Sequence, residues 1–183
     1  MLGCILIYIS HALLNNFTLQ IMVTKGGNSS HMGIAMALAA LSELPTMLLF
    51  TKMLQKKNSG FWMKLTGFFF LLKALGSWLA PNVAVYCLLQ LTQVLAWALI
   101  AVASVYYINA VMAPEDAVKG QAYYTMTYTL ASVLASLIGG PMIDRWGVPP
   151  MLLFGTLSAA LGTAVVLFSA QDTVDKGVGE VDS

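Results

Sequence analysis

The stretch ALSELPTMLLF, residues 40–50, places an acid and a proline near the middle of a long apolar run. The acid is Glu43, and an ionised side chain at bilayer depth costs at least about 2.5 kcal/mol even on the most lenient insertion scales. Because chance retention explains such a charge poorly, we expect Glu43 to have a charged partner, a bound proton or a function. Pro45 frees a backbone carbonyl and is expected to kink its helix, with lining of a cavity as the second role.

The composition around this stretch indicates an integral membrane protein. Of the 183 residues, 58% are hydrophobic and only 9% are charged, which lies far from the balance of soluble globular domains. The lipid bilayer is therefore an expected partner. The net charge is +1 and the sequence has no extended basic face, so nucleic acid is not an expected partner.

Six apolar runs approach or reach the length of a spanning helix, which needs about 20 residues at a rise of about 1.5 Å each. The runs are residues 2–22, 32–50, 61–80, 83–108, 122–141 and 149–169. The first run has no basic start and no small-residue cleavage site, so we expect it to remain as a helix. The predicted fold is an all-α membrane protein with a six-helix bundle over residues 1–170. Residues 171–183 are polar and acidic and are expected to be a disordered tail.

The basic residues predict the orientation, because cytoplasmic connections carry an excess of Lys and Arg. If the amino terminus is cytoplasmic, the outer connections hold Lys25 and Arg145. The inner connections and the tail then hold Lys52, Lys56, Lys57, Lys64, Lys119 and Lys176. We therefore expect a multi-pass protein of the plasma membrane with both termini in the cytoplasm.

Glu43 and Lys73 are the two charges expected deep in the membrane. They lie on consecutive antiparallel runs, and folding this hairpin brings them to similar depth, within about one helical turn. Two interpretations of Glu43 stay open. It is either a protonatable group in a central cavity, or an acid that Lys73 neutralises and that only fixes helix packing. The same alternatives hold for Lys73.

Further polar side chains are expected to face a cavity. Gln90, Gln93 and Trp97 follow i, i+3, i+7 spacing and therefore share one helix face. Two amides and an aromatic ring suit a sugar-like or nucleoside-like solute, and hydrogen bonding between helices is the alternative role. His11 and Asn15 share a face of the first run and are candidates to line a pore.

Small residues recur at four-residue spacing in the last two runs, which permits close packing of helix backbones. They are Ala131, Ala135 and Gly139 in the fifth run and Gly155 and Ala159 in the sixth. The expected role of these residues is structural, and a sliding or rocking surface is the alternative.

The sequence lacks the short motifs of enzymes that act on phosphates or peptide bonds. It contains no phosphate-binding loop, no H-E-x-x-H pair and no nucleophile elbow, so neither ATP-driven transport nor intramembrane hydrolysis is indicated. A single isolated histidine in the first run does not make a metal site. We therefore expect a protein that is not an enzyme and that has no cofactor and no metal.

Segments of the chain resemble the carboxy-terminal half of a major facilitator superfamily transporter. Residues 72–80, LKALGSWLA, are similar to the ninth helix of the lactose/proton symporter and its relatives, where a basic residue precedes a Gly-Ser pair. Ser42 and Glu43 resemble the start of the acidic motif in the eighth helix. Residues 120–123 and 139–147 resemble the eleventh helix and the connection after it. The nearest branch is the MFS_1-like group that includes the oligosaccharide, nucleoside and phenylpropionate proton symporters.

This resemblance implies helices seven to twelve of a permease, built as two inverted three-helix repeats. It implies proton-coupled transport of a small polar solute, sugar- or nucleoside-like. Glu43 falls where the family has an acid at the sugar and proton site, and Lys73 where it has a basic partner. Gln90 and Gln93 stand in the helix that carries the proton pathway of the lactose symporter, and Tyr128 stands near the level of a basic residue in the eleventh helix.

The last outer connection has the G-x-x-x-D-R-x-G form of the superfamily, with Gly140, Asp144, Arg145 and Gly147 at its defined positions. We expect Asp144 and Arg145 to form a local ion pair or a helix cap beside Gly147, as a structural latch.

One six-helix half cannot enclose a site at the middle of the membrane. The expected partner is therefore a missing amino-terminal six-helix half or a second copy of the chain, and the chain is otherwise a fragment or a truncated product. The alternative function is a non-transporting membrane protein that binds a partner or lipid, in which Glu43 and Lys73 serve packing.

Overall fold

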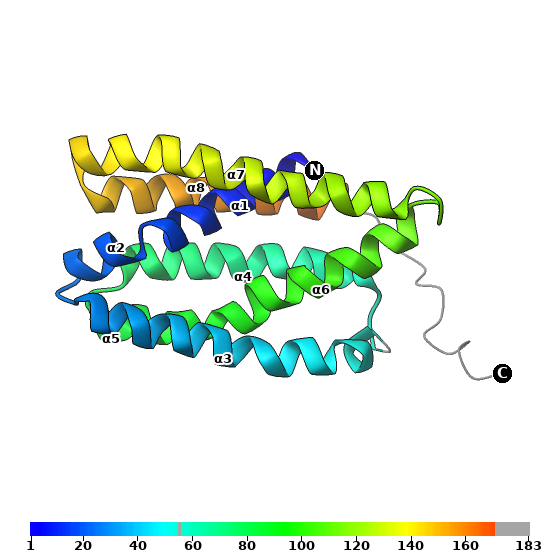
Figure 1. Cartoon of the computed structure of the whole chain (residues 1–183), viewed down its shortest axis with the longest axis horizontal. Coiled ribbons are helices and arrows are strands. Elements are labelled where there is room, and N and C mark those ends of the chain that lie inside the picture. The colour runs from blue at the N-terminus through cyan, green and yellow to red at the C-terminus, as the bar shows by residue number, and fades with distance from the viewer. Residues whose placement is uncertain (55, 171–183) are drawn as a thin grey trace.

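Long helices joined by short connections make up the computed structural model, which describes residues 1–54 and 56–170 (Figure 1). The predicted tail, residues 171–183, lies outside the described residues. The helices are α1 (Leu2–Asn16), α2 (Thr18–Thr24), α3 (Ser29–Leu54), α4 (Ser59–Leu79), α5 (Val83–Leu89), the 3₁₀ turn η1 (Gln90–Thr92), α6 (Gln93–Val111), α7 (Ala117–Trp146) and α8 (Val148–Ser169). The prediction of an all-helical protein is therefore confirmed for the described residues.

Asparagine side chains begin three of these helices by accepting hydrogen bonds from backbone N–H groups that the first helical turn leaves unpaired. Asn58 accepts from the N–H of Phe61 at 2.8 Å to begin α4, and Asn82 accepts from the N–H of Val85 at 3.0 Å to begin α5. Asn28 accepts from two backbone N–H groups in the first turn of α3. Each of these asparagines lies in a connection that the sequence predicts.

Successive long helices run in opposite directions (Figure 1). The amino terminus lies toward the same end of the bundle as the α3–α4 and α6–α7 connections, and the α2–α3, α4–α5 and α7–α8 connections lie at the other end. At that second end, Lys25 Nζ donates a 2.6 Å hydrogen bond to the carbonyl oxygen of Ala80. Partial burial lowers the pKa of Lys25 below its ordinary value.

Length and composition support four or five of the six expected spans among the described residues. Four helical stretches are long and apolar enough to cross a membrane, and α1 with α2 is a fifth if this bent pair counts as one span. The run at residues 61–80 forms α4, which has 21 residues and carries Lys64 and Lys73. The four stretches are Ser29–Phe50, Val83–Val111, Ala117–Trp146 and Val148–Ser169.

The expectation of one continuous helix over residues 2–22 is wrong. The chain leaves helical geometry at Phe17, where φ is −111° and ψ is 22°, and the axes of α1 and α2 differ by 63°. The preceding asparagines are poor helix formers, and their side chains bond elsewhere. The hydroxyl of Thr18 donates to the carbonyl oxygens of Leu14 and Asn15, at 2.8 Å each. The Thr18 hydroxyl thus lies against the backbone carbonyls of the last turn of α1.

A second irregularity interrupts the run at residues 83–108. Between α5 and α6, the backbone tightens into η1, and the hydroxyl of Thr92 donates to the carbonyl oxygen of Leu89 at 2.7 Å. Short 3₁₀ segments inside a helix mark hinges or sites of strain. The two breaks matter for function because both lie beside the same cavity, described below.

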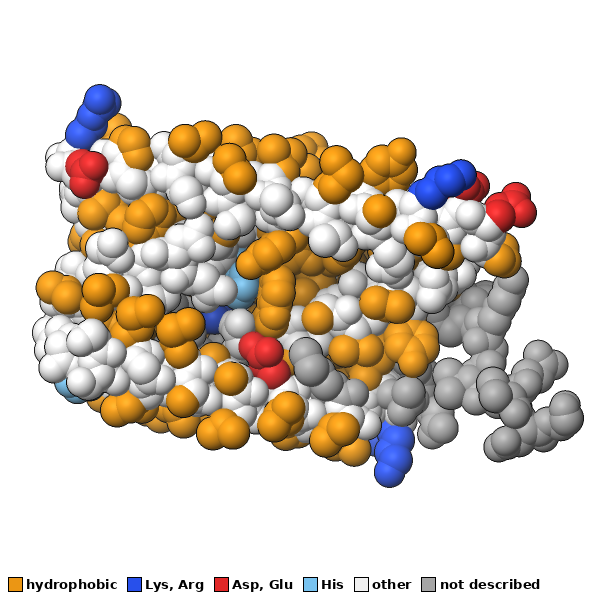
Figure 2. Space-filling model, in the orientation of Figure 1, with side chains coloured by type: hydrophobic (Ala, Val, Ile, Leu, Met, Phe, Trp, Pro, Cys, Tyr) orange, Lys and Arg blue, Asp and Glu red, His pale blue; other side chains and the backbone are white. Residues whose placement is uncertain are grey.

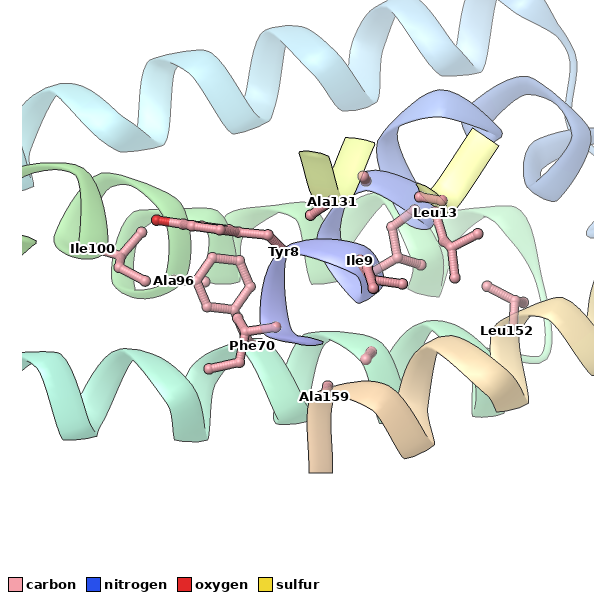
Figure 3. Packing of buried hydrophobic residues seen from close by; sticks show 14 of the residues in the cluster. Tyr8, Ile9, Leu13, Phe70, Ala96, Ile100, Ala131, Leu152 and Ala159 are labelled. Carbon is pink, nitrogen blue, oxygen red and sulfur yellow. The ribbon is translucent and has the colours of Figure 1, made fainter. Parts of the chain in front are cut away.

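Helix α1 packs between α7 and α8, and α4 packs against α6 and α8. The small residues of α7 and α8 allow this close approach, since Ala131, Ala135 and Ala159 are fully buried. A Cβ atom added to Gly139 would collide with the side chains of Leu13 on α1 and of Phe17 at the break after it. Figure 3 shows the buried side chains of α1 lying between those of α7 and α8.

Candidate functional site

A cavity of about 310 Å³ lies among α1, α2, α3, η1, α6 and α7. Figure 2 shows a hollow in the middle of this face, with an acidic side chain at its rim and a basic and a histidine side chain deeper inside. The residues that line the cavity are Asn15, Thr18, Ala35, Met36, Ala39, Ala40, Glu43, Gln90, Gln93, Trp97 and Tyr128. We call this space the outer cavity, because it lies toward the end of the bundle that is predicted to be outside.

The structure brings most of the sequence-predicted site residues to this one space. Six of them line the outer cavity directly, namely Asn15, Glu43, Gln90, Gln93, Trp97 and Tyr128. His11 and Lys73 are each 1% exposed, and each makes a hydrogen bond to a lining residue. Four helical runs far apart in the sequence thus line one polar space inside an apolar bundle.

Glu43 is half-buried on α3 at the wall of the outer cavity. The structure gives Glu43 neither an ion pair nor a hydrogen bond to any residue that it describes, so of the two interpretations left open, direct pairing of Glu43 with Lys73 is not seen in it. The two charges are still close enough for the carboxylate to attract the ammonium through space. Glu43 is therefore an acid without a fixed partner, open to a cavity.

Lys73 projects from α4 into the bundle, where its ammonium donates a hydrogen bond to Gln93 Oε1. Gln93 itself lines the outer cavity. One amide side chain thus separates the buried lysine from the space that Glu43 faces. An uncompensated ammonium in a low-dielectric interior is costly, and the amide oxygen supplies part of the compensation.

His11 contacts two residues that line the outer cavity, Asn15 and Trp97. Asn15 Nδ2 donates to His11 Nε2 at 3.0 Å, and the imidazole stacks on the indole of Trp97 with centroids 4.5 Å apart and planes 12° from parallel. Phe70 meets the imidazole edge-on at 5.3 Å. In the described residues, His11 Nδ1 has no hydrogen-bond partner. His11 thus positions Asn15 and Trp97 and does not itself line the cavity.

The remaining predicted residues lie away from the outer cavity. Pro45 is exposed on α3, which continues through it to Leu54. Asp144 and Arg145 are exposed in the last turn of α7, with no ion pair between them. Gly147 caps α7 instead, since its φ of 82° favours glycine and its N–H donates to the carbonyl oxygen of Ile143 at 2.9 Å.

Thr18 and four apolar residues of α3 line the outer cavity but escaped prediction. Ala35 and Ala39 precede Glu43 by eight and four residues. This i, i+4, i+8 spacing places small side chains on the helix face of the acid, so the same periodicity applied to Glu43 would have found them. Thr18 has no such signal, because its position depends on the break between α1 and α2.

Comparison with known proteins identifies the family of this chain. The family model described as the MFS_1 like family matches residues 1–154, a range that includes every residue of the outer cavity. No curated protein matches the sequence. With apolar helices long enough to span a bilayer and a polar cavity between them, the chain belongs to the MFS_1 like family and is a transporter-type membrane protein.

Proposed function

We propose that the chain is a six-helix bundle of a permease that carries a small polar solute across the plasma membrane together with protons. The observation that carries this proposal is Glu43, a half-buried acid at the wall of a polar cavity, for which the described part of the chain supplies no hydrogen-bonding partner. An ionisable group inside a membrane is costly, and it is typically found where it faces water, a partner or a transported ion. Lys73 is engaged by Gln93, which leaves the carboxylate of Glu43 available for a proton.

The lining of the outer cavity supports a sugar-like or nucleoside-like solute. It combines the hydroxyl of Thr18 and the amides of Asn15 and Gln90 with the ring of Trp97. Such a set can donate and accept hydrogen bonds while the indole contacts the apolar face of a ring. A volume of about 310 Å³ falls at the lower end of the range for small-molecule pockets, about 300–1,000 Å³.

The proposal counts α4 as the sixth span. Its buried Lys73 meets neighbouring helices and not lipid, and α4 lies alongside α6 and α8. The bundle then consists of two three-helix repeats, α1–α4 and α5–α8. The break between α1 and α2 and the turn η1 lie in the first span of each repeat, and interrupted helices in corresponding positions point to a binding site in transporters.

The partner in this proposal is a second six-helix bundle that covers the hollowed face in Figure 2. It is either an amino-terminal half of the same permease or a second copy of the chain. The orientation has both termini in the cytoplasm. The distribution of lysines supports this orientation. Lys56, Lys57 and Lys119 lie in or beside connections at the same end of the bundle as the amino terminus, and cytoplasmic connections carry an excess of lysine.

The test measures uptake of a panel of radiolabelled sugars and nucleosides into cells that express the chain paired with the second bundle, either as the amino-terminal half of the permease or as a second copy of the chain. We expect uptake that rises when the outside is made acidic, and we expect Glu43→Gln to abolish this dependence on the proton gradient. The matched control is Glu115→Gln, because Glu115 is exposed in the α6–α7 connection and far from the cavity lining. Unchanged, pH-sensitive uptake in the Glu43→Gln variant would remove Glu43 from proton coupling.

A further inference from the structure

A second cavity of about 260 Å³ lies between α6 and α7, and we call it the inner cavity. It shares Trp97 and Tyr128 with the outer cavity. The described residues that line it include no Asp, Glu, Lys or Arg, in contrast to the outer cavity with Glu43. They are Tyr8, Trp97, Ile100, Ala101, Ser104, Val105, Gln121, Tyr124, Thr125 and Tyr128.

The two cavities lie at different depths along the same helices. On α6, the outer cavity is lined by Gln93 and the inner cavity by Ser104, which follows eleven residues later. At the rise of an α-helix this separation is about 16 Å. On α7, Tyr128 borders both cavities, and the inner cavity extends from it back to Gln121. The cavities are therefore arranged one behind the other across the bundle.

Three rings separate them, and we call Tyr8, Trp97 and Tyr128 the aromatic cluster. The ring centroids of Trp97 and Tyr128 are 5.0 Å apart, those of Tyr8 and Tyr128 are 5.5 Å apart, and those of Tyr8 and Trp97 are 6.1 Å apart. These distances are the ordinary contact range of aromatic pairs, so the three rings pack directly against one another.

Contacts on both sides hold the aromatic cluster in place. His11 stacks on Trp97 from the side of α1, and the hydroxyl groups of Tyr8 and Tyr124 are hydrogen-bonded to each other across 116 residues of sequence. Tyr8 and Trp97 thus each contact a side chain outside the aromatic cluster, and Trp97 and Tyr128 lie where the two cavities adjoin.

We infer that the aromatic cluster is the barrier in the solute pathway, and that the inner cavity is a second binding site for an uncharged polar solute that contains a ring. The inference rests on the proposed function, because it takes the outer cavity as the first site on the same pathway. Aromatic walls contact the face of a ring, and the hydroxyls of Ser104, Thr125 and Tyr124 offer hydrogen bonds. A charged solute would find no opposite charge there and would lose its hydration.

The test measures from which side of the membrane each cavity is reached by water. Cys4 and Cys87 are first replaced by Ala, and one cysteine is then introduced by Ala39→Cys in the outer cavity or by Ser104→Cys in the inner cavity. A charged, membrane-impermeant methanethiosulfonate reagent is added to one side of sealed membrane vesicles at a time. We expect the two cysteines to be labelled from opposite sides.

The second part of the test removes one ring of the aromatic cluster and compares the labelling of the inner cavity before and after. With Trp97→Ala added, we expect the cysteine at position 104 to be labelled from the side that reaches position 39, at a rate close to that of the Ala39→Cys variant. Tyr123→Ala is the control, because Tyr123 is exposed on α7 and lines neither cavity. Trp97→Phe retains a ring and is expected to retain the barrier. Unchanged one-sided labelling at position 39 shows that each variant is folded.

The outcomes distinguish this inference from the proposed function. Labelling of both cysteines from the same side in the background without Trp97→Ala would overturn the barrier and leave the proposed function standing. Unchanged sidedness in the Trp97→Ala variant would also overturn it. Absence of labelling at position 39 from either side would show that the outer cavity holds no water, which would remove the basis of the proposed function itself.

Discussion

Gln93 has two roles at the residue scale, because it lines the outer cavity and accepts a hydrogen bond from Lys73. The ammonium of Lys73 is 1% exposed and therefore depends on protein acceptors. Glu43 attracts it only through space. The amide oxygen of Gln93 is thus the contact that allows a lysine to remain charged inside the bundle, and it separates the lysine from the acid.

This arrangement predicts an asymmetry between two substitutions. Gln93→Leu leaves a buried ammonium without its acceptor, so we expect it to lower the free energy of unfolding by about 3–5 kcal/mol. Lys73→Met removes the charge and leaves an amide oxygen unpaired, which costs about 1–3 kcal/mol. The measurement is thermal unfolding in detergent. The double variant is expected to be more stable than Gln93→Leu alone, and equal losses from both single substitutions would contradict this account.

At the element scale, the break between α1 and α2 shapes the outer cavity, because it turns Asn15 and Thr18 toward the same space. Irregular backbone at membrane depth is tolerated where polar groups satisfy it and where it borders a cavity. The hydroxyl of Thr18 is such a polar group, since it donates hydrogen bonds of 2.8 Å to two backbone carbonyls at the break.

Thr18→Val is therefore expected to destabilise the protein by about 0.5–1.5 kcal/mol, since it removes the buried hydrogen bonding of the hydroxyl to the backbone at the break. The matched control is Thr24→Val. Its hydroxyl also donates to a backbone carbonyl, that of Gln20 at 2.9 Å, but in an exposed position where water can replace it. Thermal unfolding of both variants checks the prediction. An equal loss of stability in Thr18→Val and Thr24→Val would show that the buried position of the Thr18 hydroxyl adds nothing to its contribution.

Packing of α7 against α1 leads to a second prediction at this scale. A Cβ atom on Gly139 would lie 2.6 Å from Leu13 Cδ2 and within contact of the Phe17 ring, so these side chains would have to shift, whereas a Cβ atom on Gly140 meets nothing within 4 Å. We expect Gly139→Ala to cost about 1–3 kcal/mol through overpacking. Gly140→Ala should change stability by less than about 1 kcal/mol, because alanine is the better helix former. The measurement is the thermal unfolding midpoint of each variant in detergent. A larger loss of stability in Gly140→Ala than in Gly139→Ala would contradict the close packing of α7 against α1 at Gly139.

At the scale of the whole molecule, both cavities are partly open, and α3 leaves much of its side-chain surface uncovered. Its exposed residues include Ile34, Met36, Leu41, Leu44 and Leu48. Apolar residues of this kind suit lipid, but Glu43 on the same helix does not. A second bundle over the outer cavity would remove the acid from contact with acyl chains, which is why the proposed function includes one.

Cross-linking in membranes tests this second bundle. With Cys4 and Cys87 replaced, we expect Met36→Cys at the wall of the outer cavity, once coupled to a photoactivatable maleimide-benzophenone, to form a cross-linked species with another bundle on illumination, because the benzophenone inserts into C–H bonds of any chain that it contacts. Leu157→Cys is the control, because Leu157 is 55% exposed on α8, a helix that lines neither cavity. Gel electrophoresis detects the cross-linked species by its larger mass. Cross-linking at position 157 and not at position 36 would place the partner on the wrong face.

The approximate positions of the apolar runs and their connections follow from the sequence by itself, because apolar length and asparagine capping are local properties of a segment, whereas the breaks at Phe17 and at η1 do not. Periodicity also grouped Gln90 with Gln93 and Trp97, which the structure places at one cavity. The tertiary structure alone decided that Lys73 bonds to Gln93 and not to Glu43, that α1 lies between α7 and α8, and that three aromatic rings pack together where two cavities adjoin. The physical reason is that these contacts join side chains from distant helices, such as Tyr8 and Tyr124. Their partners are selected by how whole helices pack, which no single segment of sequence encodes.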